Sequence, residues 1–152
     1  MSHVAKIEME IKDLDALAAT AKALGMEFKR GQQTYKWFGR SVGNYALPEG
    51  FTAAELGKCE HALKVKDSWG AYEIGVVKRR DGKPGYTLLW DFWNGGKDYS
   101  YTGRGLQDCV GKDGNKLKQE YALQVGTRWA QKQGMRVTRT RLEDGRVVLR
   151  AS

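Results

Sequence analysis

The clearest alternation of hydrophobic and polar positions lies near the N-terminus. Over residues 4–12 every second side chain is apolar, at Ala5, Ile7, Met9 and Ile11. A period of two residues predicts a half-buried strand. Residues 13–24 change to a helical spacing, with Asp13 as the expected N-cap and Gly25 just after the helix. The chain therefore opens with a strand followed by an amphipathic helix.

Strand-like segments fill the middle of the chain. The pattern predicts strands over residues 27–38, 61–66, 72–78 and 86–93, with a hairpin tip at 80–85. The segment 86–93 is apolar on both faces, which is typical of a central strand. A turn at 48–50 precedes a predicted capping box, Thr52 to Glu55, that opens a short helical turn.

A second helix and a hairpin are expected towards the C-terminus. Residues 95–114 are glycine-rich and polar and predict a long loop, and a helix follows over 115–133. Its apolar stripe recurs every four residues, and we interpret Trp129 on that stripe, like Trp90, as a core residue. Asp144-Gly145 between two strand-like runs predicts a closing hairpin over 135–142 and 147–150.

These elements predict an α+β fold with a mainly antiparallel sheet, two helices packed on one face, and the order β-α-β(β)n-α-β-β. A length of 152 residues favours a single domain, residues 1–152. No apolar run approaches the ~20 residues of a membrane span. Charge begins where a secretory signal would be apolar, so we expect a cytoplasmic protein with Cys59 and Cys109 as reduced thiols.

The net charge of +8 favours an anionic partner, either nucleic acid or a nucleotide. Cations alternate with aromatic residues in the segment 28–40, and residues 127–152 hold seven cations against two acids. Such mixtures suit phosphate contact and base stacking; the alternative is a set of solvated edges that block aggregation. The candidate ligand-binding residues are Lys29, Arg30, Tyr35, Lys36, Trp37, Arg40, Tyr45, Lys112, Arg136, Arg139 and Arg141.

Within this set, two segments leave alternatives open. If residues 136–141 form a strand, Arg139 and Arg141 share one face and Arg136 lies on the other, so an outer face could carry an arginine stripe. Residues 111–116 form a glycine-rich turn before a helix, which could hold a phosphate beside Lys112 or simply start the helix. Asp113 opposes the phosphate, and the second interpretation is favoured.

Sequence signatures of catalysis are missing: there is no G-x-S-x-G, H-E-x-x-H or phosphate-binding loop. We therefore expect no catalytic residue, no cofactor and no metal. Cys59 and His61 lie two residues apart and could share a face of a strand, but a zinc site needs further ligands. A buried thiol beside a hydrogen-bonded histidine is favoured over a metal site or an enzyme that uses this pair.

Several segments resemble an uncharacterised domain family that includes a conserved hypothetical reading frame of chloroplast and cyanobacterial genomes. They include residues 12–17, 114–122 and the Asp144-Gly145 hairpin, and residues 35–40, 45–51, 56–62 and 89–93 look most like the phage members. The resemblance spans nearly the whole chain and carries no known activity. It implies a bacterial or phage cytosolic setting, such as a phage accessory protein in an infected cell.

The sequence thus predicts a small non-enzymatic binding protein that recognises nucleic acid or a nucleotide, with cations on phosphates and Tyr35, Trp37 and Tyr45 stacked on bases. The alternative is a protein-interaction module, a host-takeover or adaptor factor, that docks through exposed aromatic residues around Trp37, Phe38 and Tyr45. The sequence leaves the oligomeric state open.

Overall fold

The computed structural model describes residues 4–39 and 46–152. Its strands and helices are β1 (Val4–Ile11), α1 (Leu14–Ala23), β2 (Met26–Arg30), β3 (His61–Val65), β4 (Glu73–Lys78), β5 (Tyr86–Asp91), α2 (Leu106–Val110), α3 (Asn115–Lys132), β6 (Val137–Arg141) and β7 (Val147–Ala151). Short 3₁₀ turns lie at Ala53–Glu55, Trp93–Gly95 and Lys112–Gly114.

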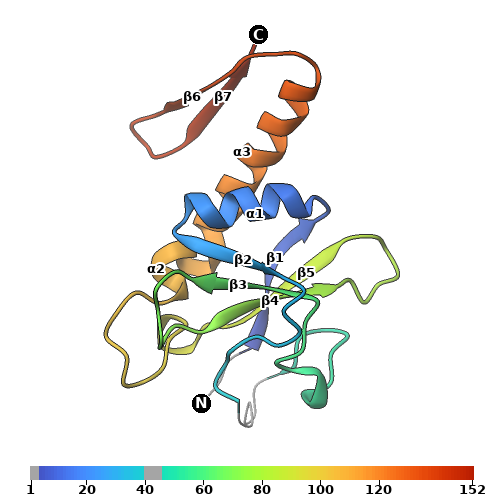
Figure 1. Ribbon diagram of the computed structural model, residues 1–152, viewed down its shortest axis with the longest axis vertical. Helices are drawn as coiled ribbons and strands as arrows, with labels where there is room; N and C mark the ends of the chain where they lie inside the picture. The colour runs from blue at the N-terminus through green and yellow to red at the C-terminus, as the bar shows by residue number, and fades with distance from the viewer. Residues whose placement is uncertain (1–3, 40–45) are drawn as a thin grey trace.

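Five strands form the main sheet, in the order β1-β5-β4-β3-β2, and every neighbouring pair is antiparallel (Figure 1). Because β5 pairs with both β1 and β4, the segment that is apolar on both faces lies inside the sheet, as its pattern predicts. The α+β class and the antiparallel sheet are confirmed.

The larger core lies between the sheet and the helices. Side chains of β3, β4 and β5 such as Leu63, Ile74 and Leu88 are fully buried there with Leu17 of α1 and Leu117 of α3. Since both long helices contribute to the same cluster, they cover the same face of the sheet. Each presents one apolar stripe to it, which is the arrangement that their spacing predicts.

A second core covers the opposite face of the sheet. The chain between β2 and β3 supplies Tyr35, Phe51 and Leu56, which pack against Ala62 of β3 and Leu89 of β5. A sheet that is buried on both faces needs cover on both, and here one cover is helical and the other is a loop.

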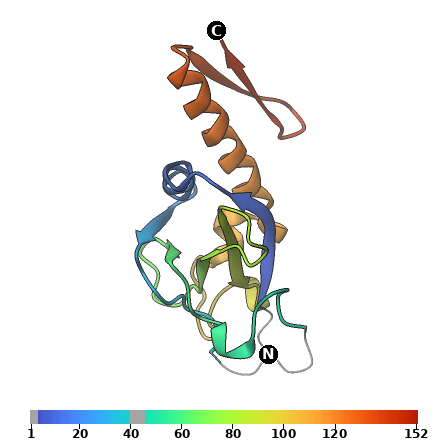
Figure 2. The same ribbon diagram turned by 90° about the vertical axis from the view of Figure 1, so that its right-hand side faces the viewer.

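The C-terminal part of the chain projects from this body as an arm. In Figures 1 and 2, α3 leads away from the sheet, and the hairpin β6–β7 lies beside the outer half of the helix. The hairpin forms its own two-stranded sheet and pairs with none of the five main strands. We call residues 115–152, α3 with its hairpin, the C-terminal arm.

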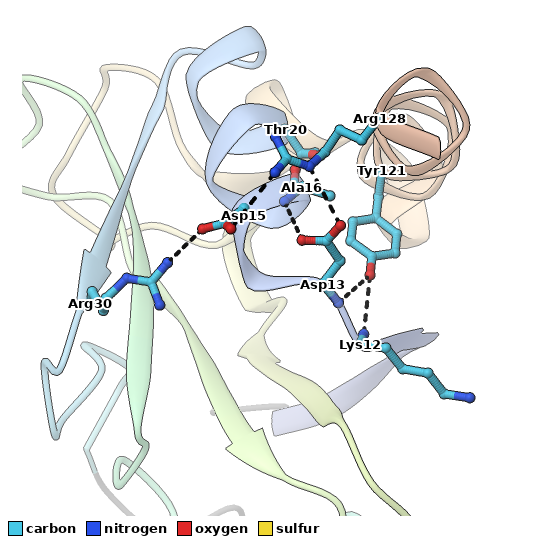
Figure 3. Close-up of polar contacts among 8 residues, drawn as sticks. All are labelled: Lys12, Asp13, Asp15, Ala16, Thr20, Arg30, Tyr121 and Arg128. Atoms are coloured by element: carbon cyan, nitrogen blue, oxygen red, sulfur yellow. Dashed lines mark hydrogen bonds and ion pairs between the residues drawn. The ribbon is translucent and has the colours of Figure 1, made fainter. Parts of the chain in front are cut away.

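Polar contacts tie the arm to the start of α1 (Figure 3). The Tyr121 hydroxyl accepts hydrogen bonds from the backbone N–H groups of Lys12 and Asp13, both at 3.1 Å. About two turns further along α3, the Arg128 guanidinium lies 3.5 Å from the Asp13 carboxylate and 3.7 Å from that of Asp15. These contacts orient α3 relative to the sheet, and with it the hairpin.

Three sequence predictions are wrong in extent or burial. The strand predicted over 27–38 ends at Arg30, where the chain turns into the loop that covers the second face. The predicted loop 95–114 contains the short helix α2. Trp90 is buried as predicted, but Trp129 is 60% exposed. A four-residue repeat drifts around a helix of 3.6 residues per turn, so Trp129 lies ~80° from Tyr121.

Candidate nucleic-acid interface

The register of the C-terminal hairpin fixes which side chains share a face. Arg139 pairs with Leu149 and Arg141 with Val147, while Thr138 pairs with Arg150. Directly paired residues of antiparallel strands point to the same side, and successive residues alternate. The hairpin therefore has one face with Arg139 and Leu149, and a second face with Thr138 and Arg150.

The first face lies against α3. An added Cβ at Gly126 would come within 3.0 Å of the Leu149 side chain, so the helix and the hairpin are in close contact there. Both terminal nitrogens of Arg139 donate to the Glu120 carboxylate of α3, each at 3.0 Å. Gln124 donates to the same carboxylate at 2.8 Å. The bidentate pair of Arg139 with Glu120 fixes the position of the hairpin on the helix.

The second face points away from α3, and we call it the outer face. Arg136 continues the ladder, because its N–H and C=O groups both bond to Ser152, and so it lies on the same side as Thr138. The exposed members of the outer face are Arg136, Thr138, Thr140 and Arg150, with Val148 half-buried between them.

Most of the net charge of the protein lies in the C-terminal arm. Residues 115–152 contain nine lysines and arginines against three acidic residues, whereas the rest of the chain is nearly balanced, with 17 cations against 15 acids. A positive arm on a nearly neutral body concentrates the electrostatic potential at one end of the molecule.

The acidic residues of the arm leave most of this charge uncompensated. Glu120 is only partly exposed and is bound by Arg139. Asp144, at the hairpin turn, pairs with Arg146 at 2.6 Å. Glu143 is exposed at the tip and opposes an anion there. The exposed outer face between Arg136 and Arg150 is therefore the most positive part of the hairpin.

The structure revises the predicted arginine stripe. Arg139 and Arg141 share a face, as expected, but that face is turned towards α3. Arg141 lines a groove between the hairpin and the start of α3, together with Lys116 and with Arg146 of the hairpin turn. Of the three predicted arginines, Arg136 is the one on the outer face, because the apolar Leu149 determines which side packs on the helix.

The predicted cations of β2 already have partners in the body of the protein. Lys29 forms an ion pair with Glu27 at 2.8 Å. Arg30 lies 3.3 Å from the Asp15 carboxylate (Figure 3) and stacks over the Phe28 ring at 5.1 Å. Exposed pairs of this kind are weak, so they do not prevent ligand binding, but they lower the net charge of this edge of the sheet.

Tyr35 and Trp37, which were predicted to stack on bases, do not expose their rings fully to solvent. Tyr35 is 2% exposed and lies on Gly75, and burial raises the pKa of its hydroxyl to about 12. The expectation that its ring stacks on a base is wrong for this conformation. Trp37 is half-buried and packs against Gly57, where an added Cβ would come within 2.6 Å of Trp37 Nε1.

Lys36 follows Tyr35 and donates from Nζ to the backbone oxygen of Trp69 at 2.8 Å. Its own backbone N–H donates to Glu73 at 2.8 Å. The lysine is therefore part of the contact between two loops. The predicted residues Arg40 and Tyr45 lie outside the described residues.

Lys112 is exposed in the 3₁₀ turn before α3. The structure gives a reason why the glycine-rich turn 111–116 starts the helix. Gly114 adopts a left-handed conformation with φ of +76°, and an added Cβ would come within 2.8 Å of Ile7 in β1. The glycine allows α3 to start close against the sheet. The neighbouring Asp113 also has a positive φ of 56°.

Cys59 lies in the loop before β3 and His61 is the first residue of β3, and each side chain is hydrogen-bonded to a residue of the preceding loop. The Cys59 thiol donates to the Gln32 backbone oxygen at 3.2 Å, and burial raises its pKa to about 12. His61 Nδ1 accepts from the Gly31 N–H at 2.9 Å, and burial lowers the histidine pKa. With its pKa raised, the Cys59 thiol stays protonated at neutral pH, whereas a nucleophilic cysteine needs the thiolate form. Burial likewise raises the pKa of Cys109.

Sequence reasoning left three residues of the outer face out of the candidate set, namely Thr138, Thr140 and Arg150. The alternation along the hairpin places these residues on the face that does not carry Arg139 and Arg141. Only the packing of the hairpin on α3 shows that this face is exposed. It also missed the exposed Tyr99, whereas the polar surroundings of Trp69 predict a half-exposed side chain that is available for stacking or docking. Trp69 is 69% exposed and contacts Tyr101 edge-on, and Tyr99 is 83% exposed and stacks with Trp93.

Among residues 4–39 and 46–152, no group of three or more His, Cys, Asp and Glu side chains could hold a metal ion. Within the same residues, no helix is both long and apolar enough to span a bilayer. No protein-family model, curated protein or solved structure matches the chain.

Proposed function

We propose that this protein is a non-enzymatic nucleic-acid-binding protein whose contact surface is the outer face of the C-terminal hairpin. The observation that carries the proposal is the exposed set of Arg136 and Arg150 with Thr138 and Thr140, on an arm that holds most of the net positive charge. The phage and cytoplasmic setting that the sequence resemblance implies stays a prediction.

The chemistry of the outer face suits a phosphate backbone. Arginine side chains bind phosphate oxygens bidentately, and threonine hydroxyls donate to them. The ion pair of Arg139 with Glu120 fixes the inner face of the hairpin to α3, so the strands that carry the exposed arginines are held in place. The position of the arm at one end of the body leaves the outer face accessible to a long polymer (Figure 2).

A second candidate is a protein-docking surface, supported by the exposed aromatic residues. Trp69 and Tyr99 expose more than half of their surface, and exposed aromatic side chains are common anchors in protein interfaces. Trp37 and Phe38, which the sequence suggested as docking residues, are half-buried. This candidate predicts loss of partner binding on Trp69→Ala and no dependence on the arm.

A salt titration tests the proposed function. We expect nuclease-treated protein to bind a short fluorescent DNA duplex, because the outer face can neutralise phosphates. About two arginine–phosphate contacts give a slope of log K against log salt near −1.8, measured by anisotropy between about 50 and 200 mM salt.

Variant Glu143→Gln tests whether removal of a negative charge from the arm raises the affinity for nucleic acid. Removing the acidic charge at the hairpin tip should strengthen binding slightly, whereas Glu49→Gln, outside the arm, should leave the affinity unchanged. No measurable binding of any nucleic acid at low salt would contradict the proposed function.

A further inference from the structure

We infer that the ligand of this outer face is duplex DNA, and that the hairpin β6–β7 enters its major groove as a two-stranded ribbon. This inference rests on the proposed function and narrows it to one class of nucleic acid. It is based on the shape of the hairpin and on which side chains are present and missing on its outer face.

The shape of the hairpin fits this groove. Two paired strands lie ~4.8 Å apart, and the major groove of B-form DNA is ~12 Å wide, so a ribbon with its side chains can enter. Each strand has five residues, a length of ~17 Å, which corresponds to about five base pairs. Because α3 covers only the opposite side of the hairpin, the outer face can approach the base edges.

The side chains of the outer face match base edges in the major groove. Arginine binds guanine O6 and N7 bidentately, and threonine bonds to several bases or contacts the thymine methyl group. Arg136, Thr138 and Thr140 follow one another at alternate positions of one strand, and Arg150 lies directly opposite Thr138. Val148, opposite Thr140, adds an apolar contact for a thymine methyl group.

Other nucleic acids fit this face less well. Single strands are held by aromatic side chains on which bases stack, and residues 136–152 contain no aromatic residue or histidine. The major groove of duplex RNA is deep and narrow, so side chains on a ribbon cannot reach the bases. Duplex DNA is the form that accepts both the ribbon and its polar face.

Dimethyl sulfate footprinting of a saturated complex tests the groove. The reagent methylates guanine N7 in the major groove and adenine N3 in the minor groove. We expect protection at guanine N7, with adenine N3 unprotected, and loss of the protection in Arg136→Ala/Arg150→Ala. Parallel anisotropy titrations should show binding to duplex DNA about tenfold or more tighter than to a single strand or to duplex RNA of the same sequence, about the effect of one base-edge contact.

The outcomes separate the two proposals. Protection at adenine N3 alone, or equal affinity for single strands or duplex RNA, overturns the major-groove inference while the proposed function stands. Failure to bind any of the three probes overturns both. Circular dichroism verifies that the double variant is folded, and Lys66→Ala/Lys83→Ala, which removes the same charge outside the arm, should keep the footprint.

Discussion

Replacing Arg136 and Arg150 together with alanine is expected to weaken the affinity for duplex DNA by about 30-fold. Each arginine that contacts a base or phosphate contributes roughly 1–3 kcal/mol, so a pair accounts for at least about 2 kcal/mol. Both side chains are exposed on the outer face and neither supports the packing of the hairpin on α3. The free energy of unfolding should therefore change little, and anisotropy at fixed salt measures the loss.

A charge-matched control distinguishes the loss of contacts on the outer face from a general loss of positive charge. Lys66→Ala/Lys83→Ala lowers the net charge by the same amount, but one residue directly follows β3 and the other lies at the β4–β5 turn. We expect this control to weaken binding less than about threefold, because salt screens the effect of exposed charges that make no contact with the DNA. Equal losses in the two double variants would contradict a defined contact surface on the hairpin.

Gly75→Ala is expected to lower the free energy of unfolding by about 2–3 kcal/mol. Gly75 lies in β4 between Ala62 of β3 and Leu89 of β5, and the Tyr35 ring lies across it. A Cβ at this position would come within 2.4 Å of Tyr35 Cδ1, so the ring would have to leave the second core. Urea denaturation monitored by circular dichroism measures the change.

A double-mutant cycle tests the cause of this destabilisation. If the cost comes from the ring, Gly75→Ala should be nearly neutral in a Tyr35→Ala background, with a coupling energy of at least about 1 kcal/mol. An equal cost in both backgrounds would show that the ring does not lie on Gly75. In that case Tyr35 would again be a candidate for base stacking.

The sequence predicts the framework of the fold because its elements have strong local patterns. The alternation in residues 4–12, the spacing of α3 and the Asp144-Gly145 turn each determine an element without reference to the rest of the chain. The packing of both long helices on one sheet face follows from their single apolar stripes. The loop between β2 and β3 has no such periodicity, and the sequence pattern left its role open.

Burial in that loop depends on partners that are distant in sequence. Tyr35 lies among glycines and cations, which suggests exposure, yet it fits over Gly75 and Ala62, whose small side chains leave room for a ring. Small residues at the same level of neighbouring strands are the sequence feature that could indicate such a site. The register that aligns them is known only from the structure.

The candidate site was predictable only in part for the same reason. Alternation along the strand places Arg139 and Arg141 on one face of the hairpin and Arg136 on the other. It does not tell which of the two faces packs on α3. The contacts of Leu149 with Gly126 and of Arg139 with Glu120 decide this, and both join residues that are separated by about twenty positions or more. The functional face is therefore a result of tertiary packing.

The most direct test of the central claim is a two-dimensional ¹H–¹⁵N NMR titration of the protein with a short DNA duplex. The account predicts that amide shift changes concentrate in residues 136–150, and that they weaken as salt is raised. Changes centred on Trp69 and Tyr99, or on the β2 edge, with the hairpin unaffected, would contradict it.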